Sequence, residues 1–264
     1  ARSPGLVLAG CLIAFVAYLP SLWVVRRLDR QPMRWAVYAA AIGFVIAFAP
    51  ITSEVTWGVI NRGVRYWQIV GLTEELTKML PVLLALVYAP RLVRNTRDGL
   101  VLGALAGLGF AVIEFGTTFA LDSFPENGWA DLYSSLPARW ALGTHDHILW
   151  GAATGGAIGY LVEAPRSRRH LLLAGLTILV VMFTHGLQDL FGKYIGPLAI
   201  GMIGRPLLTM GLTEETFQPG RPLFSVLMFA GALINTLLIN LLVIPILWKQ
   251  IRWDSGRTAI ASGT

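Results

Sequence analysis

Long apolar stretches separated by short polar connections dominate this chain. Because a transmembrane helix needs about 20 mostly apolar residues, the pattern predicts seven membrane-spanning helices. They cover approximately residues 5–25, 35–53, 67–89, 99–121, 139–162, 171–194 and 222–248. No internal repeat and no linker between domains stands out. We therefore expect an all-α helical bundle in which residues 1–264 form a single integral-membrane domain.

The composition agrees with a polytopic membrane protein. Of the 264 residues, 55% are hydrophobic and only 14% are charged, whereas about 25% are charged in an average soluble domain. The single cysteine, Cys11, excludes an internal disulfide. The protein is expected to sit in the lipid bilayer.

Basic residues gather on alternate connections between the predicted spans. They are Arg26, Arg27, Arg30 and Arg34, then Arg91, Arg94 and Arg97, then Arg166, Arg168 and Arg169, and in the tail Lys249, Arg252 and Arg257. Because Lys and Arg mark cytoplasmic loops, we expect the N-terminus outside and the C-terminus in the cytoplasm. The net charge of +6 is thereby explained by topology and by contact with anionic lipid, without a nucleic-acid partner.

Ionisable residues inside four of the spans are not explained by the apolar pattern. They are Glu74, Glu75 and Lys78 in the third span, Glu114 in the fourth, His145, Asp146 and His147 in the fifth, and His185 and Asp189 in the sixth. At about 1.5 Å per residue, the carboxylates and histidines among them all lie roughly 5–15 Å below the outer surface. A charge in a membrane helix costs about 2.5–3.5 kcal/mol on insertion scales. We therefore expect these side chains to converge on a functional site.

Helical spacing separates the roles of the two adjacent glutamates. Glu74 and Lys78 are four residues apart and share a helix face, as do His185 and Asp189. Glu75 lies about 100° around the helix from Glu74, so one glutamate is expected to do chemistry and the other to act as an anchor. Each motif alone also fits a structural role, such as a buried ion pair or an interhelical hydrogen bond. Their gathering in one layer favours a functional site.

Two kinds of hydrolytic site fit these residue types. A glutamate can activate water as a general base while histidines donate hydrogen bonds to the oxyanion. Alternatively, Glu114, His147 and His185, with one glutamate of the pair, are ligands that zinc accepts while keeping a position for water. The chain contains neither GxSxG nor HExxH. The residues themselves leave the metal-free and metal-dependent schemes open.

Four motifs in order resemble those of the PrsW family of intramembrane proteases, relatives of the CAAX-processing and bacteriocin-processing membrane endopeptidases. The motifs are Glu74-Glu75-x-x-Lys78, Phe110-x-x-x-Glu114, His147-Ile-Leu-Trp-Gly151 and His185-Gly-Leu-Gln-Asp189. The resemblance covers about residues 67–190, which we take as the catalytic core. It implies a glutamate-type endopeptidase that hydrolyses peptide bonds of membrane-anchored protein substrates, here with a site near the outer leaflet.

The resemblance also implies a role for each residue. In the CAAX-processing relatives the first glutamate of the pair activates water, with support from histidines. Carried over, Glu74 is the base, His147 and His185 bind the oxyanion or position water, and Asp189 is their partner. The whole catalytic set is Glu74, Glu75, Glu114, His147, His185 and Asp189, with Lys78, Phe110 and His145 in support.

Two positions depart from the patterns of these relatives. Glu114 stands where the CAAX-processing enzymes have a histidine, so a divalent metal such as zinc becomes a possible cofactor. Phe115 stands where PrsW proteins often have asparagine.

A second class of function uses the same residues differently. Intramembrane carboxylates and histidines also form proton or cation relays in transporters and channels. Transporters often contain internal repeats and broken helices near the midplane, whereas this chain shows no repeat and its polar layer lies off-centre. A scaffold protein that has lost activity is a third interpretation, and the intact motif set argues against it. The pattern favours the protease.

Overall fold

The computed structural model describes residues 4–29, 33–128, 144–163, 167–199, 237, 240, 241 and 243–252. Every regular element in these ranges is a helix, which confirms the all-α prediction. The elements are α1 (Pro4–Ala17), α2 (Leu19–Leu28), α3 (Trp35–Ile60), α4 (Tyr66–Tyr88), η1 (Pro90–Leu92), α5 (Thr96–Thr118), η2 (Phe119–Ser123), α6 (Phe124–Asn127), α8 (Thr144–Glu163) and α9 (Arg168–Ala199). Residues 240–241 and 243–252 are also helical.

The number of spans agrees with the prediction only in part. Within the described ranges, three helices are long and apolar enough to cross a membrane: Trp35–Ile60, Thr96–Leu121 and Arg168–Leu190. The bent pair α1 and α2 makes a fourth if it is counted as one span. Most of the seventh predicted span lies outside the described residues. The count of seven and the orientation of the termini therefore remain predictions.

Two further helices, α4 and α8, are not apolar enough to be counted as membrane spans. Their polar motifs explain why. α4 has 23 residues, about 35 Å at 1.5 Å per residue, but three charged side chains interrupt its middle. α8 begins with Thr-His-Asp-His, which lowers its hydropathy. The residues that carry the candidate chemistry are the same ones that weaken the membrane signal.

The first predicted span is broken in the structure. α1 and α2 meet at Tyr18 with a bend of 51°, and Pro20 occupies the first turn of α2. Proline lacks an N–H and clashes with the preceding turn, so it is tolerated at a helix start but breaks a continuous helix. The sequence 5–25 therefore forms two helices.

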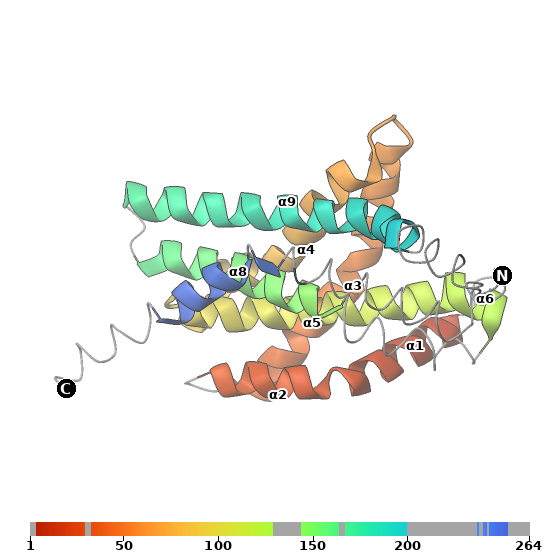
Figure 1. Cartoon of the computed structure of the whole chain (residues 1–264). Coiled ribbons are helices and arrows are strands. Elements are labelled where there is room, and N and C mark those ends of the chain that lie inside the picture. Colours follow the sequence, from red (N-terminus) through yellow and green to blue (C-terminus); the bar gives the residue numbers. More distant parts are fainter. Residues whose placement is uncertain are drawn as a thin grey trace, which may run out of the picture.

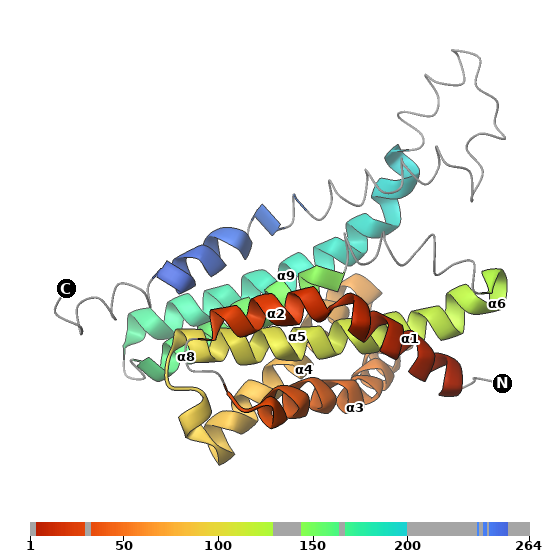
Figure 2. The same ribbon diagram turned by 90° about the horizontal axis from the view of Figure 1, so that it is seen from below.

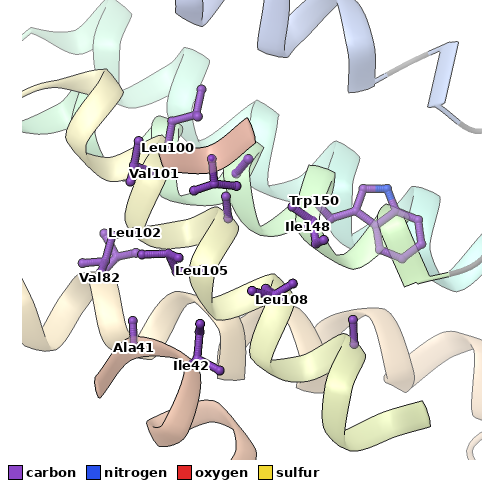
Figure 3. Close-up of a cluster of buried hydrophobic side chains, with 14 of the residues drawn as sticks. Ala41, Ile42, Val82, Leu100, Val101, Leu102, Leu105, Leu108, Ile148 and Trp150 are labelled. Carbon is purple, nitrogen blue, oxygen red and sulfur yellow. The ribbon is translucent and has the colours of Figure 1, made fainter. Parts of the chain in front are cut away.

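α5 is the central helix of the molecule. It packs most extensively against α8 and also contacts α1, α3 and α4, while α9 packs on α4 and α8. Figure 1 shows α8 beside α5 and α9 beyond α8, and Figure 2 shows α1 and α2 running along α5. Apolar side chains of α5, such as Leu105, pack in one cluster with side chains of neighbouring helices, among them Ile42, Val82 and Ile148 (Figure 3).

Two threonine pairs fix α4 against α3. Thr52 and Thr77 share a hydrogen bond, and the hydroxyl oxygens of Thr56 and Thr73 lie 2.7 Å apart. Hydroxyl pairs of this kind join transmembrane helices because lipid offers them no alternative partner. They set the rotation of α4, which carries Glu74 and its neighbours.

Glycines bring α5 and α8 into backbone contact. Gly99, Gly103 and Gly107 on α5 face a matching set on α8, Gly151, Gly155 and Gly159. A Cβ atom added at any of the six would collide with the backbone of the other helix, or for Gly159 with that just before α5. Small residues permit such close approach in membranes. At Gly107 the colliding group is the His147 carbonyl, so this glycine sets the distance between α5 and that histidine.

Substitution of Gly107 by valine is expected to destabilise the bundle and reduce activity. Overpacking a close contact costs about 1–3 kcal/mol, and here the obstacle is backbone that does not yield. Thermal unfolding in detergent would show a lower midpoint for Gly107→Val. Gly175→Val is the matched control, because a Cβ at Gly175 of α9 meets no neighbouring atom. An equal loss of stability in both variants would contradict the packing role of Gly107.

Candidate active site

Four helices contribute polar side chains to one cluster, which we call the polar centre. It comprises Glu74, Glu75 and Lys78 of α4, Glu114 of α5, His147 of α8, and His185 and Asp189 of α9. The close approach of α4 and α9 depends on Gly71, since a Cβ there would collide with the backbone at Met182 and Gly186. The six predicted catalytic residues are thus brought together.

A buried ion pair lies in the middle of the polar centre. Lys78 Nζ lies 2.6 Å from Glu75 Oε1, and both side chains are fully excluded from solvent. The same Nζ lies 4.8 Å from the ring centre of Phe110 and 5.5 Å from that of Trp150, so two aromatic faces add cation–π attraction. A buried charge is tolerated when it is paired and hydrogen-bonded. Glu75 therefore has the geometry of the anchoring glutamate.

His185 contacts carboxylates through both of its ring nitrogens. Its Nδ1 lies 2.9 Å from Glu75 Oε1. Its Nε2 lies 3.3 Å from Glu74 Oε2 and 3.8 Å from Asp189 Oδ2. The Trp150 ring packs on the imidazole with centroids 4.3 Å apart. The orientation of His185 is therefore fixed, with Nδ1 toward the anchor and Nε2 toward Glu74.

His147 bridges the ion pair and α5. Its Nδ1 lies 2.8 Å from Lys78 Nζ, and its Nε2 lies 2.5 Å from Glu114 Oε2. Its ring lies 5.3 Å from the ring of His185 and 5.2 Å from that of Phe110. The two histidines thus meet across the polar centre, and Phe110 supports both Lys78 and His147.

The carboxylates differ in their access to solvent. The side chain of Glu114 is 38% exposed, that of Asp189 31% and that of Glu74 15%, whereas that of Glu75 is completely buried. Glu74 Oε2 and Asp189 Oδ2 are nevertheless buried atoms that accept no hydrogen bond. The polar centre therefore has a closed side at Glu75 and Lys78 and an open side at Glu114 and Asp189.

His145 and Asp146 point elsewhere. His145 Nε2 lies 3.1 Å from Ser21 Oγ of α2, and its ring packs edge-on against Tyr18. The buried Asp146 carboxylate accepts hydrogen bonds from Gln188 of α9 and from Asn240. Successive helical residues are turned by about 100°, so neighbours of His147 face other helices. These contacts place His145 at the junction with α2, a position that differs from its predicted supporting role.

Trp150 borders the polar centre, although its sequence motif was not expected to give it a role. It is buried and contacts His147, His185 and Lys78. It lies three residues after His147, which places it on the same helix face. That spacing within the His147–Gly151 motif is the signal that could have identified it.

The polar centre satisfies the simplest requirements of a metal site. Ligand atoms of Glu74, His147 and His185 all lie within 4.8 Å of one another. Around a tetrahedral zinc ion with bonds of about 2.0–2.1 Å, ligand atoms lie about 3.3 Å apart, so a small inward movement would complete the set. The unpaired carboxylate oxygens of Glu74 and Asp189 are suitable ligands as well. The residues fit a divalent ion.

Comparison with known protein families decides the assignment. A sequence model described as PrsW family intramembrane metalloprotease matches residues 31–213. The chain belongs to the PrsW family. That match confirms the resemblance carried by the four motifs, and it extends from before α3 to beyond α9. PrsW proteins are intramembrane proteases, so the protein belongs to a family of membrane-embedded enzymes. No curated protein and no solved structure matches the chain.

Proposed function

We propose that this PrsW protein is an endopeptidase that cuts membrane-anchored proteins near the outer leaflet, using water activated by Glu74. The observation that carries the proposal is the contrast between the two adjacent glutamates. Glu75 is bound by Lys78 and His185, whereas Glu74 Oε2 accepts no hydrogen bond and faces His185 Nε2. A carboxylate oxygen with a free lone pair is suited to receive a proton from water.

The remaining groups have roles that follow from their positions. A substrate carbonyl that enters from the open side would lie near His147, whose Nε2 points toward Glu114. Hydrogen bonds from such a histidine stabilise the oxyanion that forms when water attacks the carbonyl. Glu74, which has taken the proton from the attacking water, can return it to the leaving amine as the C–N bond breaks, while Glu114 orients His147. The rings of Phe110 and Trp150 line the polar centre beside the two histidines. We expect these rings to limit the entry of further water.

A divalent ion such as zinc would be held by Glu74 and His185, with either His147 or Asp189 as the third ligand. Bound there, zinc would polarise the substrate carbonyl and make a coordinated water nucleophilic at neutral pH. In that case Glu74 would serve as a ligand, and Glu114 or an unbound Asp189 would accept the proton of the water.

Metal content distinguishes the two roles of Glu74. If Glu74 is a ligand, purified Glu74→Gln should lose bound zinc together with activity. If Glu74 is only the base, the variant should keep the ion and lose activity alone. Elemental analysis of the purified protein, with chelation and zinc restoration of the wild type, gives the answer. Activity that survives complete chelation would contradict any need for an ion.

The proposed substrates and location follow from the family and the charge pattern. A protease whose polar centre lies within a helical bundle acts on segments held in or beside the bilayer. The arginine-rich connections predict a site on the outer side of a prokaryotic cytoplasmic membrane. Cysteine labelling from each side tests this directly. A cysteine at Arg94 should react only from the cytoplasm, and reaction only from outside would contradict the orientation.

A further inference from the structure

We infer that the buried Lys78–Glu75 pair holds His147 and His185 in opposite tautomers, so that one presents a proton and the other a lone pair to the same pocket. The catalytic meaning of this arrangement rests on the proposed function. The arrangement itself rests on three contacts within the polar centre, which form a chain from His147 through Lys78 and Glu75 to His185.

The first half of the argument concerns His147. A lysine ammonium has three donors and no acceptor, and Lys78 Nζ lies 2.8 Å from His147 Nδ1. The contact therefore requires Nδ1 to accept a hydrogen bond. A neutral imidazole carries one proton, which must then be on Nε2. That nitrogen faces Glu114 Oε2 at 2.5 Å, where a carboxylate oxygen is a ready acceptor.

The neighbours of Lys78 make it the donor in this contact. Glu75 Oε1 lies 2.6 Å away, and the rings of Phe110 and Trp150 present two π faces to the amine. A carboxylate oxygen and aromatic ring faces all interact favourably with a donating ammonium group. Lys78 therefore donates to His147, and the reverse direction is disfavoured.

The second half concerns His185, where the same reasoning gives the opposite result. Glu75 Oε1 only accepts hydrogen bonds and lies 2.9 Å from His185 Nδ1, so Nδ1 carries the proton. Nε2 then has a free lone pair. The carboxylate oxygens that face Nε2 are Glu74 Oε2 at 3.3 Å and Asp189 Oδ2 at 3.8 Å.

Opposite tautomers give the two histidines different chemistry. His147 can donate from Nε2 to a developing oxyanion. His185 can accept a proton from water or bind an ion, but cannot donate from Nε2. The assignment also selects the metal ligands, because His147 has no free lone pair while Lys78 is charged. Glu74, His185 and Asp189 are then the set that would hold an ion.

Lys78 and Glu75 are positioning residues in this scheme. Neither is required to touch the substrate, and each acts by fixing the proton on one histidine. Their adjacency on one turn of α4 explains why a single ion pair can serve two rings on two other helices. An ion pair with a purely structural role would not make the two histidines carry their protons on different ring nitrogens.

The test is nitrogen-15 NMR of the full-length wild-type protein, labelled only at histidine and embedded in lipid nanodiscs after removal of metal. The chain has four histidines, and His→Gln variants assign them one at a time. Protonated and unprotonated ring nitrogens give well-separated shifts. The expected result is a proton on Nε2 of His147 and on Nδ1 of His185. The same tautomer in both rings, or an imidazolium at either, would overturn the inference.

Zinc titration followed in the same spectra provides the second readout. Zinc should move the Nε2 resonance of His185 and leave the Nε2 proton of His147 in place. Zinc that leaves His185 unshifted, or that removes the His147 proton, would overturn the ligand assignment. Because no substrate is present, these outcomes are independent of the protease function, which fails only if cleavage does not depend on Glu74.

Discussion

Replacing Glu74 by glutamine is expected to lower peptide-bond cleavage by about 10²–10⁴-fold, the range that general acid–base catalysis contributes. Glutamine keeps the size of the side chain but cannot accept a proton from water or bind a divalent ion strongly. The comparison is quantitative proteomics of membranes from cells that contain the wild type or Glu74→Gln. Membrane-tethered proteins that accumulate uncut in the variant are the substrates.

A matched control separates loss of chemistry from loss of fold. Glu54→Gln makes the same change at an exposed position of α3, outside the polar centre, and should leave cleavage unchanged. Both variants should express and unfold like the wild type. Wild-type turnover by Glu74→Gln would remove Glu74 from the mechanism.

Replacing Lys78 by methionine is expected to destabilise the protein by about 3–5 kcal/mol. Removing one partner of a buried ion pair leaves the other as an uncompensated charge, and here Glu75 would remain fully buried. Methionine preserves the length and packing of the side chain. The free energy of unfolding in mixed detergent micelles, measured with increasing denaturant, would report the loss.

The double variant Glu75→Gln, Lys78→Met tests this reason for the loss. It removes both charges and should recover much of the stability, while cleavage should remain low because the histidines lose their anchor. Lys249→Met, at an exposed position, is the control for loss of a lysine alone. A double variant as unstable as Lys78→Met would show that the buried charge was not the cause.

The sequence was sufficient to predict the helical class and the family. Helical spans leave a strong hydropathy signal, and intramembrane charges are costly enough to mark a functional site. The convergence of Glu74, Glu114, His147 and His185 was predictable because all were expected at one depth. The family match confirms what their order implied.

Other features depend on side-chain directions that the sequence does not contain. Spacing required Glu74 and Glu75 to point differently, but only the contacts of Glu75 with Lys78 and His185 identify the anchor. His145 was grouped with His147 by proximity in sequence, whereas helix rotation turns it to Ser21. The break at Tyr18 was missed because hydropathy does not report a proline at a helix start.

The most direct test of the central claim is cleavage of one accumulated substrate by purified protein reconstituted in lipid vesicles. The account predicts a single cut near the outer end of the membrane anchor, with one oxygen from labelled water in the new carboxyl terminus, as shown by mass spectrometry. Glu74→Gln and His185→Gln should give no product. Equal product from wild type and Glu74→Gln would contradict the claim that these helices form one hydrolytic centre.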